Sequence, residues 1–208
     1  MTELTIHHTV DPRADTSVPD PHQDHFHKTI LGFWVYLMTD CLIFATLFIT
    51  YAVLSPNTFG GPTPHDIFHV STAFTETIIL LVSSVTGGFI VLAAAKNKVS
   101  QIYLWMVITL ILGVAFLYLE VSEFTRLINE GATWKVSAFL SSFFTLIGTH
   151  GVHIAFGCLW LVVMFFQVLF QGITIDTFRR LAVFSLFWHF LDLIWIFVFT
   201  FVYLMGAV

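Results

Sequence analysis

Five long apolar runs constrain this chain more than any other feature of its sequence. They cover roughly residues 30–54, 72–95, 102–124, 138–169 and 181–205. Each run is at least as long as the ~20 residues that an α-helix needs to cross the hydrocarbon core of a bilayer. Because a backbone inside lipid must satisfy its own hydrogen bonds, such runs predict membrane-spanning helices. The sequence therefore predicts an all-α integral membrane protein, built as a bundle of five transmembrane helices.

The composition supports this class and excludes others. Hydrophobic residues make up 57% of the 208 residues and charged residues only 10%, whereas ordinary soluble domains carry about 25% charge. The eight Lys and Arg residues are scattered over the loops and cannot form a phosphate-binding face, so nucleic acid is excluded as a partner. Cys41 and Cys158 both lie in apolar runs, and we expect small buried hydrophobic residues rather than a disulfide or a metal site.

The chain is expected to divide into two parts. Residues 1–28 are polar and lack the apolar core of a signal peptide, which predicts a disordered cytoplasmic tail. Residues 29–208 form the predicted five-helix transmembrane domain. With the tail inside, six of the eight Lys and Arg residues lie in inner segments, and only Arg126 and Lys135 lie in outer ones. This excess predicts a cytoplasmic N-terminus and a periplasmic C-terminus.

Ionisable side chains inside the apolar runs are the candidate functional residues, because charges are costly in a bilayer. Three pairs have the spacing i, i+3, which puts both members on one helix face: Glu120/Glu123, His150/His153 and His189/Asp192. At about 1.5 Å per residue, the position of a residue along its run gives its depth in the membrane. These depths predict an inner cluster of Asp40, His189 and Asp192, an outer cluster of Glu76, Glu120, Glu123 and Arg126, and, between the two, His150 and His153.

A metal or haem site is one use for such residues. The sequence contains neither the Glu-x-x-His pairs of a di-iron bundle nor the His-Glu-x-x-His pattern of a zinc site. A haem held by two histidines needs them at one depth. His153 and His189 differ by about 14 Å when residues are counted from the turn between their helices. No ligand set is therefore complete.

Two other uses remain open. Chains of Asp, Glu and His can carry protons across a membrane, although no continuous row of polar residues links the two predicted clusters. Alternatively, the side chains hydrogen-bond across helices, which contributes about 0.6 kcal/mol per contact in membranes. Small residues support this second use, because they allow helices to approach closely. They are Gly87 and Gly88 in the second run and Gly148, Gly151 and Gly157 in the fourth. Buried polar contacts between helices are the interpretation that the residues favour.

Four motifs resemble those of a known family. They are Gly-Phe-Trp-Val-Tyr-Leu-Met-Thr-Asp (32–40), Val-Ser-Glu-Phe (121–124), Gly-Thr-His-Gly-Val-His (148–153) and Trp-His-Phe-Leu-Asp-Leu-Ile-Trp (188–195). Their residues and their order resemble subunit III of the haem–copper terminal oxidases, over nearly the whole membrane region. The five-span length and the closing Val-Tyr-Leu-Met-Gly look most like the cytochrome o ubiquinol oxidase branch of that family.

The resemblance implies an accessory subunit of a proton-pumping terminal oxidase in the bacterial inner membrane. Haems and copper are expected in subunit I, the main partner, and not in this chain; subunits II and IV and phospholipids are the other partners implied. No catalytic, cofactor-binding or metal-binding residue is therefore expected here. The structural or lipid-contacting residues implied in the membrane are Asp40, Glu76, Glu120, Glu123, His150, His153, His189 and Asp192.

Two alternative functions fit parts of the sequence. Subunit III of a bacterial cytochrome c oxidase is one, because the electron-donor site belongs to other subunits. A stand-alone membrane cytochrome or proton-conducting protein is the other, and it is motivated by the histidines inside the apolar runs.

Overall fold

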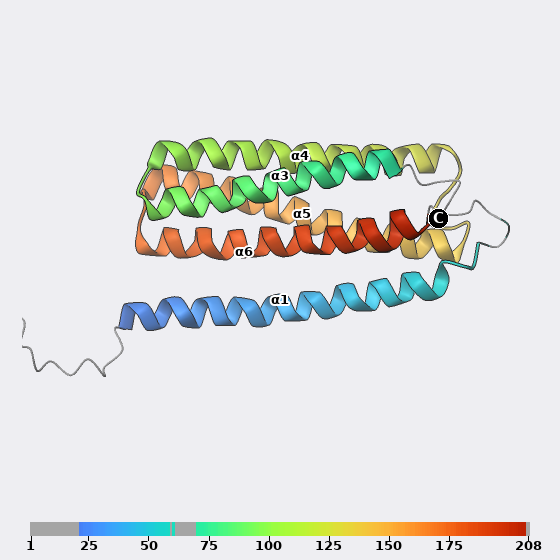
Figure 1. Cartoon of the computed structure of the whole chain (residues 1–208), viewed down its shortest axis with the longest axis horizontal. Helices are drawn as coiled ribbons and strands as arrows, with labels where there is room; N and C mark the ends of the chain where they lie inside the picture. Colours follow the sequence, from blue (N-terminus) through green and yellow to red (C-terminus); the bar gives the residue numbers. More distant parts are fainter. Residues whose placement is uncertain (1–20, 59, 61–69, 207–208) are drawn as a thin grey trace, which may run out of the picture.

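The computed structural model describes residues 21–58, 60 and 70–206, and side chains from residue 28 onward. In this part of the chain the regular structure is helical (Figure 1). The elements are α1 (Pro21–Leu54), α3 (Val70–Ala95), α4 (Val99–Asn129), α5 (Ala138–Gln171), α6 (Ile175–Val198) and the π-helix η1 (Phe199–Leu204), which continues α6. Each of the five predicted runs is confirmed as a helix long and apolar enough to cross a membrane.

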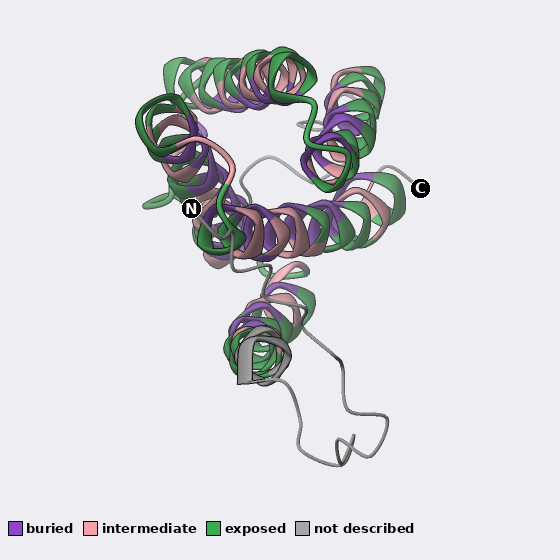
Figure 2. Ribbon diagram, turned by 90° about the vertical axis from the view of Figure 1, so that its left-hand side faces the viewer, coloured by how far each residue is buried: buried purple, intermediate pink, exposed green. Residues whose placement is uncertain are grey.

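Four helices form a bundle, and α1 packs on its outside. α3, α4, α5 and α6 make a ring in which α3 contacts α4 and α6, and α5 contacts the same two helices. α1 packs mainly against α5 and α6, and it lies apart from α4 (Figure 1). Seen from one end, the buried residues line the faces where helices meet (Figure 2). Because lipid is as apolar as a leucine side chain, close packing and polar contacts must hold these helices together.

Local sequence explains where α5 and α6 begin and end. The hydroxyl of Ser137 accepts a hydrogen bond from the Leu140 N–H at 3.1 Å, and Thr174 caps the Thr177 N–H at 3.2 Å. α5 ends at Gln171, and the next residue is Gly172, whose φ of 69° would strain an L side chain. The short turn that follows makes α5 and α6 antiparallel neighbours.

α1 begins earlier than the polar tail was expected to end. Its first residue is Pro21, where a proline is well placed because the first N–H groups of a helix have no internal partner. The predicted tail boundary at residue 28 thus falls inside a helix, and residues 1–20 lie outside the described residues. α1 and α5 contain 34 residues each, so at about 1.5 Å per residue both are longer than the ~30 Å hydrocarbon core.

The bundle is built around Trp188 of α6, which is fully buried. Glycines on three other helices make room for its indole ring. A Cβ atom added at Gly157 of α5 would lie 2.7 Å from Trp188 Cζ3, and one added at Gly113 of α4 would lie 2.9 Å from Trp188 Cη2. A Cβ added at Gly87 of α3 would lie 3.5 Å from Trp188 Cδ1. We call these three glycines the Trp188 socket.

The two cysteines differ in burial. Cys158 is buried, as expected, whereas Cys41 is exposed, so the expectation of two buried cysteines is wrong for Cys41. The reason is the position of α1 outside the ring. Because α1 packs on the bundle along one side only, much of its surface remains uncovered in the isolated chain.

Candidate functional site

Three carboxylates gather at the end of the bundle where α3 begins and α4 ends. Glu76 of α3 and Glu120 and Glu123 of α4 are all buried, and they lie near one another across the contact between the two helices. We call these three residues the carboxylate cluster. Tyr203 of η1 donates a hydrogen bond to Glu123 Oε2 at 3.0 Å, and Arg126 Nη2 lies 3.8 Å from Glu123 Oε1. The predicted outer cluster therefore exists as a group in space.

A glycine lets the carboxylate cluster reach a third helix. A Cβ atom added at Gly151 of α5 would lie 2.8 Å from the carboxyl carbon of Glu120. The carboxylate thus packs directly onto the α5 backbone, at a distance that only glycine allows. The cluster therefore joins α3, α4, α5 and η1 at one level of the bundle.

His150 of α5 is completely buried and joins α5 to α6. Its Nε2–H donates a hydrogen bond to the backbone carbonyl of Leu191 at 3.2 Å. The ring centroids of Phe44, Phe116 and Trp195 lie 6.4, 5.8 and 5.1 Å from that of the imidazole. A ring enclosed in this way leaves no room beside it for a haem. It acts as a donor and as packing between helices.

His153 lies one turn further along α5 and faces α1. Its Nδ1–H donates to the carbonyl of Thr149 in its own helix at 2.7 Å, and its Nε2 lies 3.8 Å from Oδ2 of Asp40. Asp40 is 5% exposed and also interacts with the hydroxyl of Tyr36. These side chains form a polar contact between α1 and the bundle.

The predicted inner cluster is wrong in its membership. Asp40 faces α5, whereas Asp192 of α6 is buried beside Ser84 of α3. His189 is exposed, and its Nδ1 contacts the carbonyl of Ser185 at 2.5 Å. Counting residues gives the depth of a side chain but not the side of the helix on which it lies, so depth alone cannot show that Asp40 lies away from His189 and Asp192.

Three hydrogen bonds between α3 and its neighbours are not visible in the sequence. Two are donated by buried indoles of α6 to hydroxyls of α3, and one joins hydroxyls of α3 and α4. The pairs and their distances are Trp188–Ser83 (3.0 Å), Trp195–Thr77 (3.1 Å) and Thr86–Thr109 (2.8 Å). Isolated Ser and Thr residues in an apolar run carry no spacing signal, and their partners become evident only when the helices are assembled.

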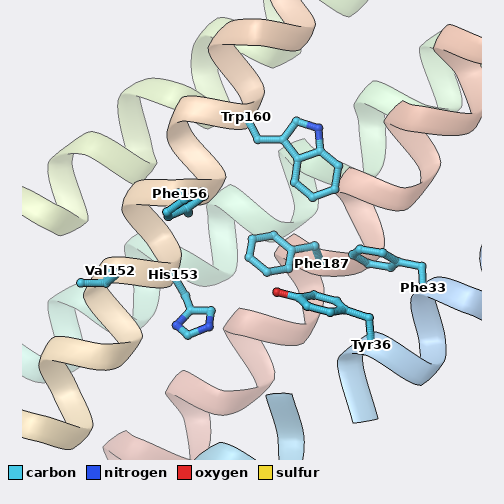
Figure 3. A pocket seen from close by; sticks show the side chains of 7 residues that line it. All are labelled: Phe33, Tyr36, Val152, His153, Phe156, Trp160 and Phe187. Carbon is cyan, nitrogen blue, oxygen red and sulfur yellow. The ribbon is translucent and has the colours of Figure 1, made fainter. Parts of the chain in front are cut away.

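A cavity of about 570 Å³ lies between α1, α5 and α6 (Figure 3). Its lining is mostly aromatic, and the hydroxyl of Tyr36 and the ring of His153 point into it. The residues that line it are Phe33, Tyr36, Val152, His153, Phe156, Trp160 and Phe187. A smaller cavity of about 250 Å³ shares Trp160 with it and is also lined by Thr29, Asp176, Arg179, Arg180 and Val183.

The geometry of these sites favours a structural role, in which side chains join neighbouring helices, over the binding of a metal or a haem. Among the described residues, no group of three or more His, Cys, Asp or Glu side chains is arranged to hold a metal ion. His150 is enclosed by aromatic rings. His153 and His189 each use one ring nitrogen to donate a hydrogen bond to a carbonyl of their own helix. The arrangement can join helices and can accept an apolar ligand in the cavity beside α1.

Comparison with known proteins adds the family context. The family model described as cytochrome c oxidase subunit III matches residues 11–207. The chain is 50% identical over 198 residues to cytochrome bo(3) ubiquinol oxidase subunit 3 of Pseudomonas aeruginosa, which covers 93% of this chain and 95% of the relative. It is 42% identical to quinol oxidase subunit 3 of Bacillus spizizenii, covering 93% and 95%. It is 41% identical to cytochrome c oxidase subunit 3 of a Bacillus species, covering 86% of each.

Proposed function

The chain belongs to the cytochrome c oxidase subunit III family, and from this premise we propose that it is the accessory third subunit of a proton-pumping ubiquinol oxidase. The observation that carries this proposal is its similarity to quinol oxidase subunits 3 over almost the full length. In this role the chain carries no redox cofactor, packs on the catalytic subunit I and stabilises it. The haems and the copper belong to subunit I.

The buried histidines fit a structural role in such a complex. His150 bonds a carbonyl of α6, and His153 faces Asp40 of α1, so each serves a contact between two helices. Contacts of this kind contribute about 0.6 kcal/mol each in membranes. The chain thereby presents a fixed surface to subunits I, II and IV.

The inner side of the membrane is proposed to be the end where α1 begins and where α3 turns into α4 and α5 into α6. This end lies on the left in Figure 1. Cations favour the cytoplasmic side of a bacterial inner membrane. The cations near this end are Lys28, Lys96, Lys98, Arg179 and Arg180, and those near the other end are Arg126 and Lys135. The N-terminus is then cytoplasmic and the C-terminus periplasmic.

A phospholipid is the ligand proposed for the cavities beside α1. The aromatic lining of the larger cavity suits an acyl chain, and Trp160 connects it to the smaller cavity, where two arginines can attract a phosphate. Arg179 Nη2 already lies 3.3 Å from Asp176, whereas Arg180 has no ion pair with any described residue. Arg180 is thus the cation available to a headgroup.

Replacing Arg180 with glutamine should lower the affinity of the purified oxidase for anionic phospholipid about fivefold. The reason is that a cation near the membrane surface contributes about 1 kcal/mol to such binding. Native mass spectrometry of the complex measures the bound lipid. Lys98→Gln at the same end of the bundle is the matched control, and it should leave lipid retention unchanged. Equal retention in both variants would show that the cavity beside Arg180 is not the lipid site.

Purification of the chain through an affinity tag tests the proposed function. We expect a haem-containing oxidase to co-purify and to oxidise ubiquinol. Purification of the chain alone, or with a haem of its own in a one-to-one ratio, would contradict the proposal.

The similarity to a cytochrome c oxidase subunit 3 makes cytochrome c the second candidate for the electron donor of the complex. Assays of the same preparation with ubiquinol and with reduced cytochrome c separate the two functions.

A further inference from the structure

His189 lies at the middle of a membrane span and is nevertheless exposed in the isolated chain. The apolar span formed by α6 and η1 runs from Ile175 to Leu204, so at about 1.5 Å per residue His189 is ~20 Å from either end. Other exposed side chains of α6 at this depth, such as Leu193, are apolar and suit lipid. An imidazole facing acyl chains at this depth is costly, so we expect a polar group to cover it.

The hydrogen bonds of His189 define what that group must supply. Nδ1 lies 2.5 Å from the carbonyl of Ser185 and 3.3 Å from its hydroxyl, so Nδ1 carries the proton and donates it to the carbonyl. Nε2 is then an acceptor, and no described residue donates to it. Gly88 of α3 lies beside the ring and has no side chain that could donate to it. A Cβ added at Gly88 would lie 3.8 Å from Nε2. The missing partner is a hydrogen-bond donor.

Asp192 lies one turn along α6 from His189, but it does not require a donor from outside the chain. It is 5% exposed, its carboxylate oxygens are covered by this chain, and it interacts with Ser84 of α3. The donor is therefore needed at His189 Nε2. Acyl chains have no donor, and lipid headgroups are ~20 Å away along the span. A transmembrane helix with a hydroxyl, amide or cationic side chain supplies one.

We propose that a transmembrane helix of another oxidase subunit packs on the α3–α6 face, which consists of Ser84, Gly88, Ser185 and His189, and donates a hydrogen bond to His189 Nε2. Small residues on this face allow two backbones to approach closely. The inference rests on the proposed function, because it requires a partner subunit. It adds the surface, the depth of the contact and the polarity of the partner group.

Site-specific crosslinking in the intact complex tests this surface. A photoreactive amino acid replaces Val85 of α3 or Leu193 of α6 beside the face, and Val114 of α4 serves as the control with similar exposure. We expect crosslinks to another oxidase subunit from Val85 and Leu193 and none from Val114. Crosslinks to lipid alone, to a second copy of this chain, or from Val114 alone would overturn the proposal. Failure of the chain to purify with any oxidase would instead overturn the proposed function.

Two substitutions at His189 separate the hydrogen bond from mere packing. His189→Leu removes the acceptor and should lower the fraction of oxidase that retains this chain in detergent about threefold, as expected for loss of one intramembrane hydrogen bond. His189→Gln keeps an acceptor at similar reach and should retain the chain as the parent does. Equal retention in the two variants would show that no donor from a partner meets Nε2.

Discussion

Gly157→Ala should destabilise the bundle by about 2–3 kcal/mol, because the socket around Trp188 has no space for another methyl group. The new Cβ would lie 2.7 Å from Cζ3 and 3.0 Å from Cε3 of an indole that is itself fully buried. Gly113→Ala should have a similar effect, since its Cβ would lie 2.9 Å from both Trp188 and the sulfur of Cys158. The free energy of unfolding in mixed detergent micelles measures both effects.

A matched glycine and a compensating change make this prediction specific. Gly32 of α1 has no atom within 4 Å of an added Cβ, so Gly32→Ala should leave the free energy of unfolding nearly unchanged. Adding Trp188→Leu to Gly157→Ala should cost less than the sum of the single changes, because the smaller side chain removes the clash. If Gly157→Ala were as harmless as Gly32→Ala, the socket would not be a close-packed contact.

His150→Ala should lower the free energy of unfolding by about 2–4 kcal/mol, because it leaves a cavity in the interior. Phe44, Phe116 and Trp195 surround the imidazole, and the hydrogen bond to Leu191 is lost with it. His150→Leu refills most of that volume and should cost less than about 1.5 kcal/mol. The same unfolding measurement compares the two variants.

The comparison of alanine with leucine identifies what His150 contributes. If packing dominates, the leucine variant is stable and the oxidase keeps its activity. Equal destabilisation by both substitutions would mean that the hydrogen bond to the Leu191 carbonyl dominates, and loss of activity in a stable leucine variant would assign His150 a chemical role.

The sequence predicts the elements of this fold better than their contacts. Length and hydropathy suffice for the five helices, because a bilayer fixes both quantities. Depth along the helices is also enough to predict the carboxylate cluster, because Glu76, Glu120 and Glu123 lie near the same end of two adjacent helices. Hydropathy does not indicate the start of α1 at Pro21, because polar residues can continue a helix that projects from the membrane.

The contacts depend on which side of each helix meets which neighbour. Asp40 and Asp192 have similar depths but face α5 and α3 respectively, so grouping them by depth failed. Gly113 stands alone in an apolar run, and its importance follows only from the position of Trp188 on another helix. Ser83 is equally inconspicuous until it accepts the hydrogen bond of that indole. These partners are brought together by the tertiary arrangement and have no local sequence pattern.

The haem content of an oxidase in which His150→Leu, His153→Gln and His189→Gln are combined distinguishes structural histidines from haem ligands. None of the introduced side chains can replace histidine as a haem ligand. Because these histidines are proposed to hold helices and a partner subunit, the ratio of haem to subunit I and the visible spectrum should equal those of the parent oxidase, whether or not this chain is retained. Loss of a haem while this chain remains bound would instead show that at least one of the three histidines holds a haem.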